Sequence, residues 1–229
     1  MSTNRDLKTV AHSIIREKLI NCELVPGAMI NEAQLCSELN ISRTPVREAL
    51  SRLESEGFIK IISKKGIYVT DVTLNDVMQI FQARMEVEPV ALRIAGPRLP
   101  RIELEEFRSK FADKEPDIKN AFRLDTAMHL FIVEHCGNRF IIDMMHKVFA
   151  ENTRVIISSK QNEVNIHDAR KEHLEILELL INQEYEKAAS SMQNHIKNCR
   201  QAALEHFYSI QNYSYGPTSV YKDELRKIK

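Results

Sequence analysis

Two helical patterns separated by only three residues constrain the fold of this chain more than any other feature. In the first pattern, Leu35 and Leu39 stand four residues apart and share one face of a helix. Asn31 can cap that helix, and Gln34 follows three residues later, as in a capping box. Residues 40–42 then fit a tight turn. The spacing predicts a short helix, a turn and a second helix.

The second helix is predicted from its ends and from its apolar face. Thr44 can cap it, and Pro45 suits its first position because the N–H group that proline lacks would have no partner there. Gly57 is expected to end it. Its apolar residues recur at the spacing of one helix face and are Val46, Ala49, Leu50 and Leu53.

An earlier helix and a later hairpin complete this unit. The apolar spacing predicts a helix over residues 6–21. Residues 58–62 and 67–70 are rich in β-branched and aromatic side chains, and the sequence Ser-Lys-Lys-Gly at 63–66 separates them. This pattern predicts a β-hairpin with a basic tip. Three helices followed by a hairpin indicate a winged helix-turn-helix domain, which we place at residues 1–72.

Only helical periods follow from residue 73 onward. The expected helices span residues 73–95, 101–112, 117–135, 138–159, 166–182 and 184–208. We therefore predict a mainly α fold, in which residues 73–212 form an all-helical antiparallel bundle. Residues 213–229 are predicted to be a polar tail.

The composition fits a globular protein of the cytoplasm. No run of about 18 apolar residues is present, so no membrane span is expected. The first ten residues lack the apolar core of a signal peptide. The four cysteines are far apart and form no C-x-x-C pair, which favours free thiols in a reducing compartment.

The charge of the chain favours DNA binding only in one segment, residues 40–66. The chain has 32 basic and 32 acidic residues, so the whole molecule has no formal net charge. Residues 40–66 contain six Lys or Arg against three Glu, a local surplus of three positive charges. The alternative is that this module serves only for packing and that its arginines are solvated.

The second helix of a helix-turn-helix enters the major groove with its N-terminal residues near the base edges. Arg43 and Arg47 could each bind a guanine by two hydrogen bonds, and Thr44 could donate to a phosphate or a base. Lys64 and Lys65 stand at the hairpin tip, where a wing would meet phosphates or the minor groove. These residues are candidates for DNA binding.

The run VPGAMINEAQLCSELNISRTPVREALSRLESEGFIKIISKKGIYVTDV resembles the DNA-binding domain of the GntR family of regulators. The resemblance implies that Arg43, Thr44, Arg47 and Gly66 contact double-stranded DNA. It also implies a homodimer on a two-fold operator, which is the usual arrangement for helix-turn-helix proteins. A family contact early in the second helix is often an arginine; here the residue is Ala33, so that role is not carried over.

Four residues of the predicted bundle could hold a divalent ion. Asp125 and His129 are four apart and share a helix face. His173 and His195 are equally distant from the predicted turn at 182–184, so an antiparallel hairpin would place both about 16 Å from that turn. One carboxylate and three imidazoles suit Zn, Ni or Mn. The alternative is coincidence, since the chain has eight histidines.

Residues from about 75 to 208 resemble the FCD domain, the effector domain of the FadR subgroup of GntR regulators. The matching segments are ARMEVEPVALRIA, LDTAMHLFIVEHCGN, EHLEILELL and AASSMQNHI. In metal-binding members the ligands fall at the positions of Asp125, His129, His173 and His195. The resemblance implies that the ion helps to hold a small organic acid, whose carboxylate completes the coordination.

Two arginines are candidate partners for the carboxylate of that effector, because guanidinium pairs with carboxylate by two hydrogen bonds. They are Arg84 and Arg154. The alternative is ordinary ion pairing, of Arg84 with Glu88 and of Arg154 with Glu151.

The leading hypothesis is a DNA-binding repressor that a small organic acid releases. A second hypothesis is a DNA-binding protein whose metal-free bundle serves only for dimerisation. A third is a metal-dependent hydrolase, but the chain has no H-E-x-x-H motif and no carboxylate clearly placed as a general base. We therefore do not expect an enzyme.

Overall fold

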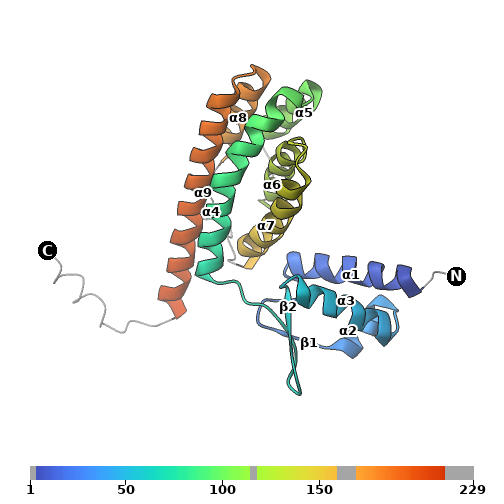
Figure 1. Cartoon of the computed structure of the whole chain (residues 1–229). Helices are drawn as coiled ribbons and strands as arrows, with labels where there is room; N and C mark the ends of the chain where they lie inside the picture. Colours follow the sequence, from blue (N-terminus) through green and yellow to red (C-terminus); the bar gives the residue numbers. More distant parts are fainter. Residues whose placement is uncertain (1–3, 114–117, 159–168, 215–229) are drawn as a thin grey trace, which may run out of the picture.

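The computed structural model describes residues 4–113, 118–158 and 169–214 of the chain. The N-terminal elements are three helices and three short strands. They are α1 (Asn4–Ile20), β1 (Met29–Ile30), α2 (Glu32–Leu39), α3 (Arg43–Ser55), β2 (Ile59–Ile62) and β3 (Gly66–Val69). The predicted order of three helices and a hairpin is confirmed, and Figure 1 shows this unit beside the larger helical bundle.

The turn between α2 and α3 follows the sequence pattern with two corrections. Asn31 caps α2 and accepts hydrogen bonds from the backbone N–H groups of Ala33 and Gln34. The Gln34 side chain donates to Glu38 instead of returning to the cap, so the reciprocal half of the predicted capping box is absent. The α3 cap position is Ser42 and not Thr44, which was predicted.

This shift at the start of α3 has a simple reason. With Arg43 as the first helical residue, Pro45 takes the third position, where a backbone N–H also has no partner within the helix. Proline is therefore tolerated there as well as at the predicted first position. At the other end, Gly57 follows the cap residue with φ +91°, so glycine ends the helix as predicted.

The hairpin is part of a three-stranded antiparallel sheet in the order β1-β3-β2. Strand β1, only two residues long, was not predicted; Met29 pairs with Tyr68, and Ile30 pairs with Ile67. The tip lies between β2 and β3 as expected, and Lys64 adopts a left-handed conformation with φ +61°.

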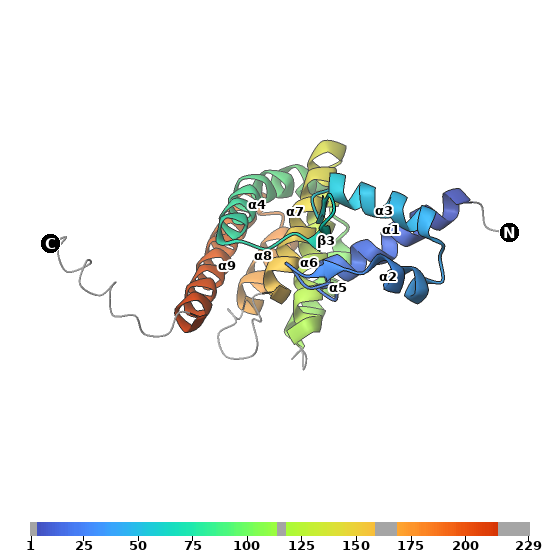
Figure 2. The same ribbon diagram turned by 90° about the horizontal axis from the view of Figure 1, so that it is seen from below.

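The C-terminal elements form a helical bundle, which confirms the predicted fold class. They are α4 (Leu74–Ala95), the 3-10 turn η1 (Gly96–Arg98), α5 (Arg101–Ala112), α6 (Ile118–Glu134), α7 (Arg139–Ser158), α8 (Arg170–Ile181) and α9 (Tyr185–Ser214). The long helices α4 and α9 lie side by side in both views (Figures 1 and 2). Thr73 and Asp76 begin α4 with a reciprocal capping box.

Several sequence-based boundaries shift at the ends of the bundle helices. Helix α9 runs to Ser214, past the predicted end at 208. The rest of the predicted tail lies outside the described residues, as does the predicted start of α8 at 166–168. Within the described residues, no helix is both long enough and apolar enough to cross a membrane.

A buried arginine joins the two parts of the molecule. Arg154 on α7 donates a hydrogen bond of 2.6 Å to the backbone carbonyl of Thr70, just after β3. The thiol of Cys22, just after α1, lies 3.8 Å from the backbone oxygen of Arg154. Ala150 on α7 is buried in the apolar core of the N-terminal unit. Helix α7 therefore contacts the winged helix directly.

Candidate metal centre and nucleic-acid interface

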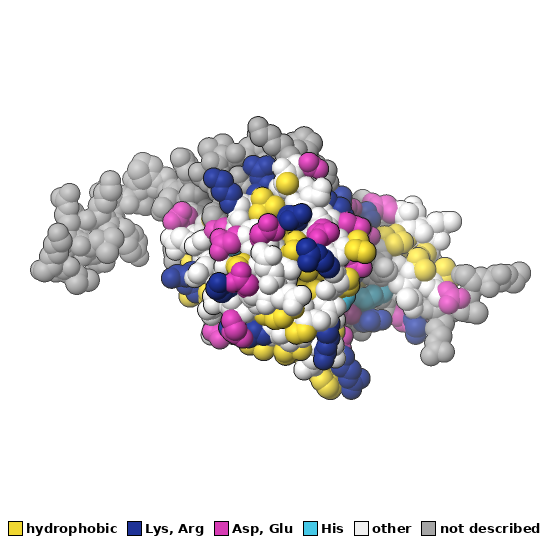
Figure 3. Space-filling model, turned by 90° about the horizontal axis from the view of Figure 1, so that it is seen from above, with side chains coloured by type: hydrophobic (Ala, Val, Ile, Leu, Met, Phe, Trp, Pro, Cys, Tyr) yellow, Lys and Arg dark blue, Asp and Glu magenta, His cyan; other side chains and the backbone are white. Residues whose placement is uncertain are grey.

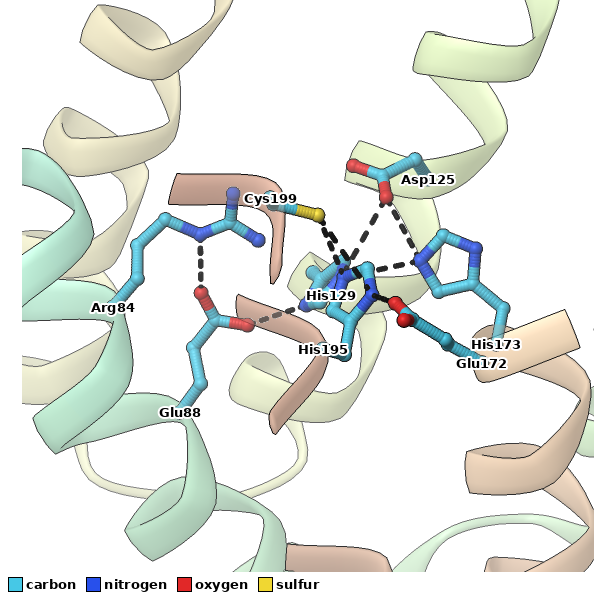
Figure 4. Close-up of polar contacts among 8 residues, drawn as sticks. All are labelled: Arg84, Glu88, Asp125, His129, Glu172, His173, His195 and Cys199. Atoms are coloured by element: carbon cyan, nitrogen blue, oxygen red, sulfur yellow. Dashed lines mark hydrogen bonds and ion pairs between the residues drawn. The ribbon is translucent and has the colours of Figure 1, made fainter. Parts of the chain in front are cut away.

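Four side chains converge inside the bundle from three helices. Asp125 and His129 come from α6, His173 from α8 and His195 from α9 (Figure 4). One ligand atom from each lies within 4.8 Å of all the others, and the three histidines are buried. We call these four residues the metal cluster.

The distances inside the metal cluster fit a single ion. The Nε2 atom of His195 lies 3.2 Å from Nε2 of His129 and 3.3 Å from Nε2 of His173. The Oδ1 atom of Asp125 lies 2.9 Å from Nε2 of His173 and 3.7 Å from Nε2 of His129. Two nitrogen ligands of a tetrahedral zinc ion stand about 3.3 to 3.4 Å apart. A proton can bridge one pair of these nitrogens, whereas a central ion can bind all of them.

The short distance between His173 and His195 confirms the prediction from their equal spacing about the turn. Helices α8 and α9 pack against each other along the bundle, and the two rings lie 4.4 Å apart between centroids. Asp125 and His129 also share one face of α6, as their spacing of four residues predicted.

Carboxylates orient two of the three imidazoles from behind. Nδ1 of His129 contacts the Glu88 carboxylate, and Nδ1 of His195 lies 2.9 Å from Oε2 of Glu172. Histidines that bind metals usually donate their second nitrogen to such a group, which leaves Nε2 free to coordinate. Nδ1 of His173 is buried and lacks a hydrogen-bond partner in the described part of the chain.

Sequence reasoning did not assign these carboxylates to the site. Glu172 directly precedes His173, and its side chain lies beside His195 of the next helix. Glu88 stands four residues after Arg84, which indicated a possible ion pair but not its contact with His129. Which side chains of two neighbouring helices meet depends on how each helix is rotated about its own axis. The spacing of residues in the sequence does not give that rotation.

Electrostatic interactions keep Asp125 of the metal cluster and the neighbouring Glu88 ionised. Burial would raise the pKa of Glu88, but the charges of Arg84 and His129 lower it to about 2. Burial would likewise raise the pKa of Asp125, but the charge and hydrogen bond of His129 hold it well below the usual value. The site therefore offers an anionic oxygen to a cation.

The imidazoles of His129 and His195 differ in their pKa values. Burial would lower the pKa of His129, but the charges of Glu88 and Asp125 raise it to about 9. Burial lowers the pKa of His195 to about 4. In the metal-free protein, His129 therefore carries a proton at neutral pH, and His195 presents an uncharged imidazole.

Arg84 lies beside the metal cluster and is almost fully buried. Its Nε donates to Oε1 of Glu88 at 2.6 Å, so the ion pair considered from the sequence is present. Its Nη2 is buried without a hydrogen-bond partner in the described part of the chain. A buried donor without a hydrogen bond lowers the stability of a folded protein. A ligand that accepts a hydrogen bond from this Nη2 would remove that penalty.

Arg154 is placed differently from the other candidate effector residue. It pairs with Glu151 at 2.8 Å, which was the alternative considered from the sequence, and with the Thr70 carbonyl. Its guanidinium also lies over the ring of Phe58. These contacts are with the winged helix and with its own helix, and the structure does not bring Arg154 to the metal cluster.

The candidate DNA-binding residues lie on the exposed surface of the N-terminal unit. Arg43, Thr44 and Arg47 occupy the first turns of α3 and are exposed. The Nε atom of Arg47 lies 2.9 Å from both carboxylate oxygens of Glu32 on α2. This pair holds the arginine at the surface, and it must open or be shared when a nucleic acid arrives.

The tip of the hairpin presents the remaining candidates. Lys64 and Lys65 are exposed there, and the Tyr68 hydroxyl donates to the backbone oxygen of Lys65 at 3.1 Å. Gly66 has φ +123°, a conformation that residues with a side chain rarely adopt. The glycine therefore shapes the tip on which both lysines stand.

Models of two protein families match these two structural units. The model for bacterial regulatory proteins of the GntR family matches residues 7–69, and the FCD domain model matches residues 79–198. The chain belongs to the GntR family and carries an FCD domain. GntR proteins with this architecture are helix-turn-helix transcription regulators, so the protein binds DNA through its N-terminal domain and is not an enzyme.

Two curated relatives agree with the GntR assignment. The chain is 28% identical over 140 residues to the uncharacterized HTH-type transcriptional regulator YdhC of Bacillus subtilis (strain 168), across 58% of this chain and 62% of YdhC. It is 22% identical to the HTH-type transcriptional repressor RspR of Escherichia coli (strain K12), across 85% of this chain and 87% of RspR.

The fold also matches a solved structure of E. coli McbR/YncC, with a TM-score of 0.74 and 21% identity, covering 91% of this chain and 100% of that one. At this identity, the likeness supports the fold alone.

The surface of this GntR regulator is electrostatically mixed at the end of the bundle remote from the winged helix. Figure 3 shows acidic and basic side chains interspersed there, without a face of one sign. This agrees with the zero formal net charge of the chain. The local basic surplus of residues 40–66, near α3 and the hairpin, is a feature that favours DNA.

Proposed function

We propose that this GntR regulator is a homodimeric repressor that leaves its operator when a small organic acid binds at a divalent metal ion in the FCD bundle. The observation that carries the proposal is the convergence of one carboxylate and three imidazoles within 4.8 Å. The relative RspR, which is named a repressor, supports the direction of regulation.

The metal cluster would hold the ion through Oδ1 of Asp125 and the Nε2 atoms of the three histidines. Zn, Ni or Mn suits such a mixed oxygen and nitrogen set. The ion would supply a positive charge that attracts a carboxylate. Arg84 would bind the same carboxylate, since its buried Nη2 lacks a partner in the described part of the chain.

Helix α7 offers a route from the acid to the DNA-binding domain. Phe149 on α7 lies against two residues of the site: its ring centroid is 5.8 Å from that of His129 and 4.8 Å from the Arg84 guanidinium carbon. Five residues later on the same helix, Arg154 is bonded to Thr70 after β3. An acid that moves Arg84 would shift α7 and change the position of the winged helix. It regulates only to the extent that it binds the two arrangements differently.

The DNA contacts would come from two places on the winged helix. Arg43, Thr44 and Arg47 would face base edges and phosphates in the major groove. Lys64, Lys65 and the backbone at Gly66 would meet the phosphates or the minor groove. A homodimer would present two copies to a two-fold operator, and such a regulator would act in the cytoplasm.

The experiment has two steps. Purified full-length protein first selects its binding sites from randomised DNA duplexes, and an inverted repeat is expected. The fluorescence anisotropy of a selected duplex is then titrated with metal-loaded protein, in the presence and absence of a panel of small carboxylic acids.

At least one acid is expected to weaken DNA binding by metal-loaded wild type and to have no effect on metal-loaded Arg84→Ala. Arg93→Ala, which changes an exposed arginine of the same helix, is the control that should behave as wild type. DNA binding that no acid changes, with identical behaviour of metal-loaded and metal-free protein, would favour a bundle used only for dimerisation.

A further inference from the structure

The ion pair that joins α2 to α3 has one sheltered partner and one exposed partner. Glu32 is the first residue of α2, and its side chain is 22% exposed. Arg47 lies in the second turn of α3, and its side chain is 65% exposed. The two residues are 15 positions apart, so the pair depends on how the two helices of the helix-turn-helix pack. The carboxylate is thus the anchored end, and the guanidinium extends into solvent.

Two features of α2 favour the observed position of the Glu32 carboxylate. Asn31 fixes the first turn of the helix by accepting hydrogen bonds from the backbone N–H groups of Ala33 and Gln34. A negative charge in the first turn also interacts favourably with the partial positive charge at a helix N-terminus. The carboxylate is therefore a prepositioned acceptor, and an arginine that binds it loses the freedom to adopt other rotamers.

Glu32 binds only one of the three nitrogens of the Arg47 guanidinium. The Nε atom lies 2.9 Å from both carboxylate oxygens. In the described part of the chain, the hydrogen bonds of Arg47 all come from this Nε, so both Nη groups are available to a ligand. A guanidinium is a planar fork that can bind O6 and N7 of one guanine through two N–H groups. Fixing Nε therefore fixes the direction in which the Nη groups point.

We infer that Glu32 is a positioning residue for DNA recognition, which holds Arg47 through Nε so that its two Nη groups bind one guanine in the major groove. The inference rests on the DNA contact proposed for Arg47. Glu32 contributes through Arg47, because it orders the arginine before the complex forms. Less side-chain entropy is then lost when the base contact is made.

The charge of Glu32 has the opposite effect on DNA of any other sequence. A carboxylate beside the DNA-binding surface repels phosphates and partly neutralises Arg47, so it weakens binding that depends on charge alone. A guanine that accepts both Nη hydrogen bonds offsets this repulsion, whereas another base does not. Glu32 should therefore lower the affinity for unrelated DNA and raise discrimination at one base pair. A surface ion pair without this role would change the affinity for all sequences alike.

The test measures discrimination at each base pair as well as affinity. Full-length protein and its variants are titrated by fluorescence anisotropy with the selected operator duplex, with duplexes that each carry one substituted base pair, and with an unrelated duplex. The base pair at which Arg47→Ala loses discrimination is the one that Arg47 reads. The matched control is Glu38→Gln, which removes a negative charge from the same helix, where the carboxylate contacts Gln34 and Lys18.

Glu32→Gln is expected to lose about 2- to 10-fold of the discrimination at that base pair, the effect of leaving one long side chain unordered. It should also bind the unrelated duplex more tightly than wild type. Glu38→Gln should keep the wild-type discrimination at every position. Glu32→Gln combined with Arg47→Ala should lose no more discrimination than Arg47→Ala alone, because the two residues act as one unit.

Three results would overturn the inference. The first is wild-type discrimination at every position in Glu32→Gln, and the second is an equal loss in Glu38→Gln. The third is weaker binding of Glu32→Gln to every duplex, because removal of a negative charge from a folded DNA-binding surface should strengthen non-specific binding. If Arg47→Ala loses discrimination nowhere, the proposed base contact of Arg47 fails together with the inference, whereas the effector site is unaffected.

Discussion

Arg154 of α7 donates a hydrogen bond of 2.6 Å to the backbone carbonyl of Thr70, the residue that follows β3. The arginine is almost fully buried, and its guanidinium also lies over Phe58 of the winged helix. This bond attaches α7, the helix that borders the metal cluster, to the end of the last strand of the wing. The two domains therefore share a fixed point on the route that we propose for an effector signal.

Arg154→Ala tests that attachment. Removal of the guanidinium leaves the Thr70 carbonyl without this donor, which should lower the free energy of unfolding by about 1 to 3 kcal/mol. The effect of metal and acid on DNA affinity should also shrink, while DNA binding itself persists. Urea unfolding and anisotropy titrations measure the two effects.

The matched control for Arg154 is Arg101→Ala, which removes an exposed arginine from a surface pair with Glu105. Exposed pairs of this kind contribute little, so stability and regulation should stay near those of wild type. Equal effects of the two substitutions would contradict the special role of Arg154.

Glu172→Gln tests the carboxylate behind His195. Glutamine keeps the size of the side chain but loses the charge that orients the imidazole through Nδ1. Metal affinity should fall by about 10- to 100-fold, with the fold retained. Isothermal titration with zinc measures the change. Glu175→Gln, on the same helix but bonded to Ser191, should keep the wild-type affinity; an equal loss there would indicate a general effect of charge.

Arg43→Ala and Lys65→Ala should weaken DNA binding in different ways. If Arg43 reads a base, its loss should cost about 1 to 3 kcal/mol of binding and relax specificity at one position. If Lys65 meets a phosphate, its loss should weaken binding to all sequences and reduce the salt slope by about 1. Anisotropy titrations at several salt concentrations separate the two.

The control for the DNA contacts is Lys110→Ala, which removes a positive charge from α5 of the bundle. Its operator affinity and salt slope should equal those of wild type. A loss as large as that of Lys65→Ala would mean that overall charge, and not contact at the hairpin tip, determines the affinity.

The sequence predicts most of the fold because local patterns determine it. The apolar stripe of α3, the glycine after its end and the β-branched and aromatic runs of β2 and β3 are all local signals, and these elements form where expected within a few residues. Strand β1 was not predicted, because two residues are too few to show a periodic pattern of apolar side chains. Its pairing with β3 is a long-range contact between Met29 and Tyr68.

The candidate site could be predicted only in part. Asp125 and His129 share one helix face, and the symmetry of His173 and His195 about a turn places them at one level. These relations follow from helix geometry. The contact between Glu88 and His129 spans 41 residues and depends on how α4 and α6 pack, so no spacing rule gives it.

The same limit applies to the two candidate effector arginines. Arg84 and Arg154 look alike in the sequence, since each has an acidic residue three or four positions away. Only the packing distinguishes them, because Arg84 lies beside the metal cluster and Arg154 lies at the contact between the domains.

The most direct test of the metal-dependent effector site is elemental analysis of the purified protein beside His173→Ala and His195→Ala. Close to one divalent ion per wild-type chain is expected, and this ion should be lost from both variants. His146→Ala, which changes an exposed histidine paired with Glu134, should retain it. A wild-type protein that holds no metal, even after incubation with Zn, Ni or Mn, would contradict the metal-dependent effector site.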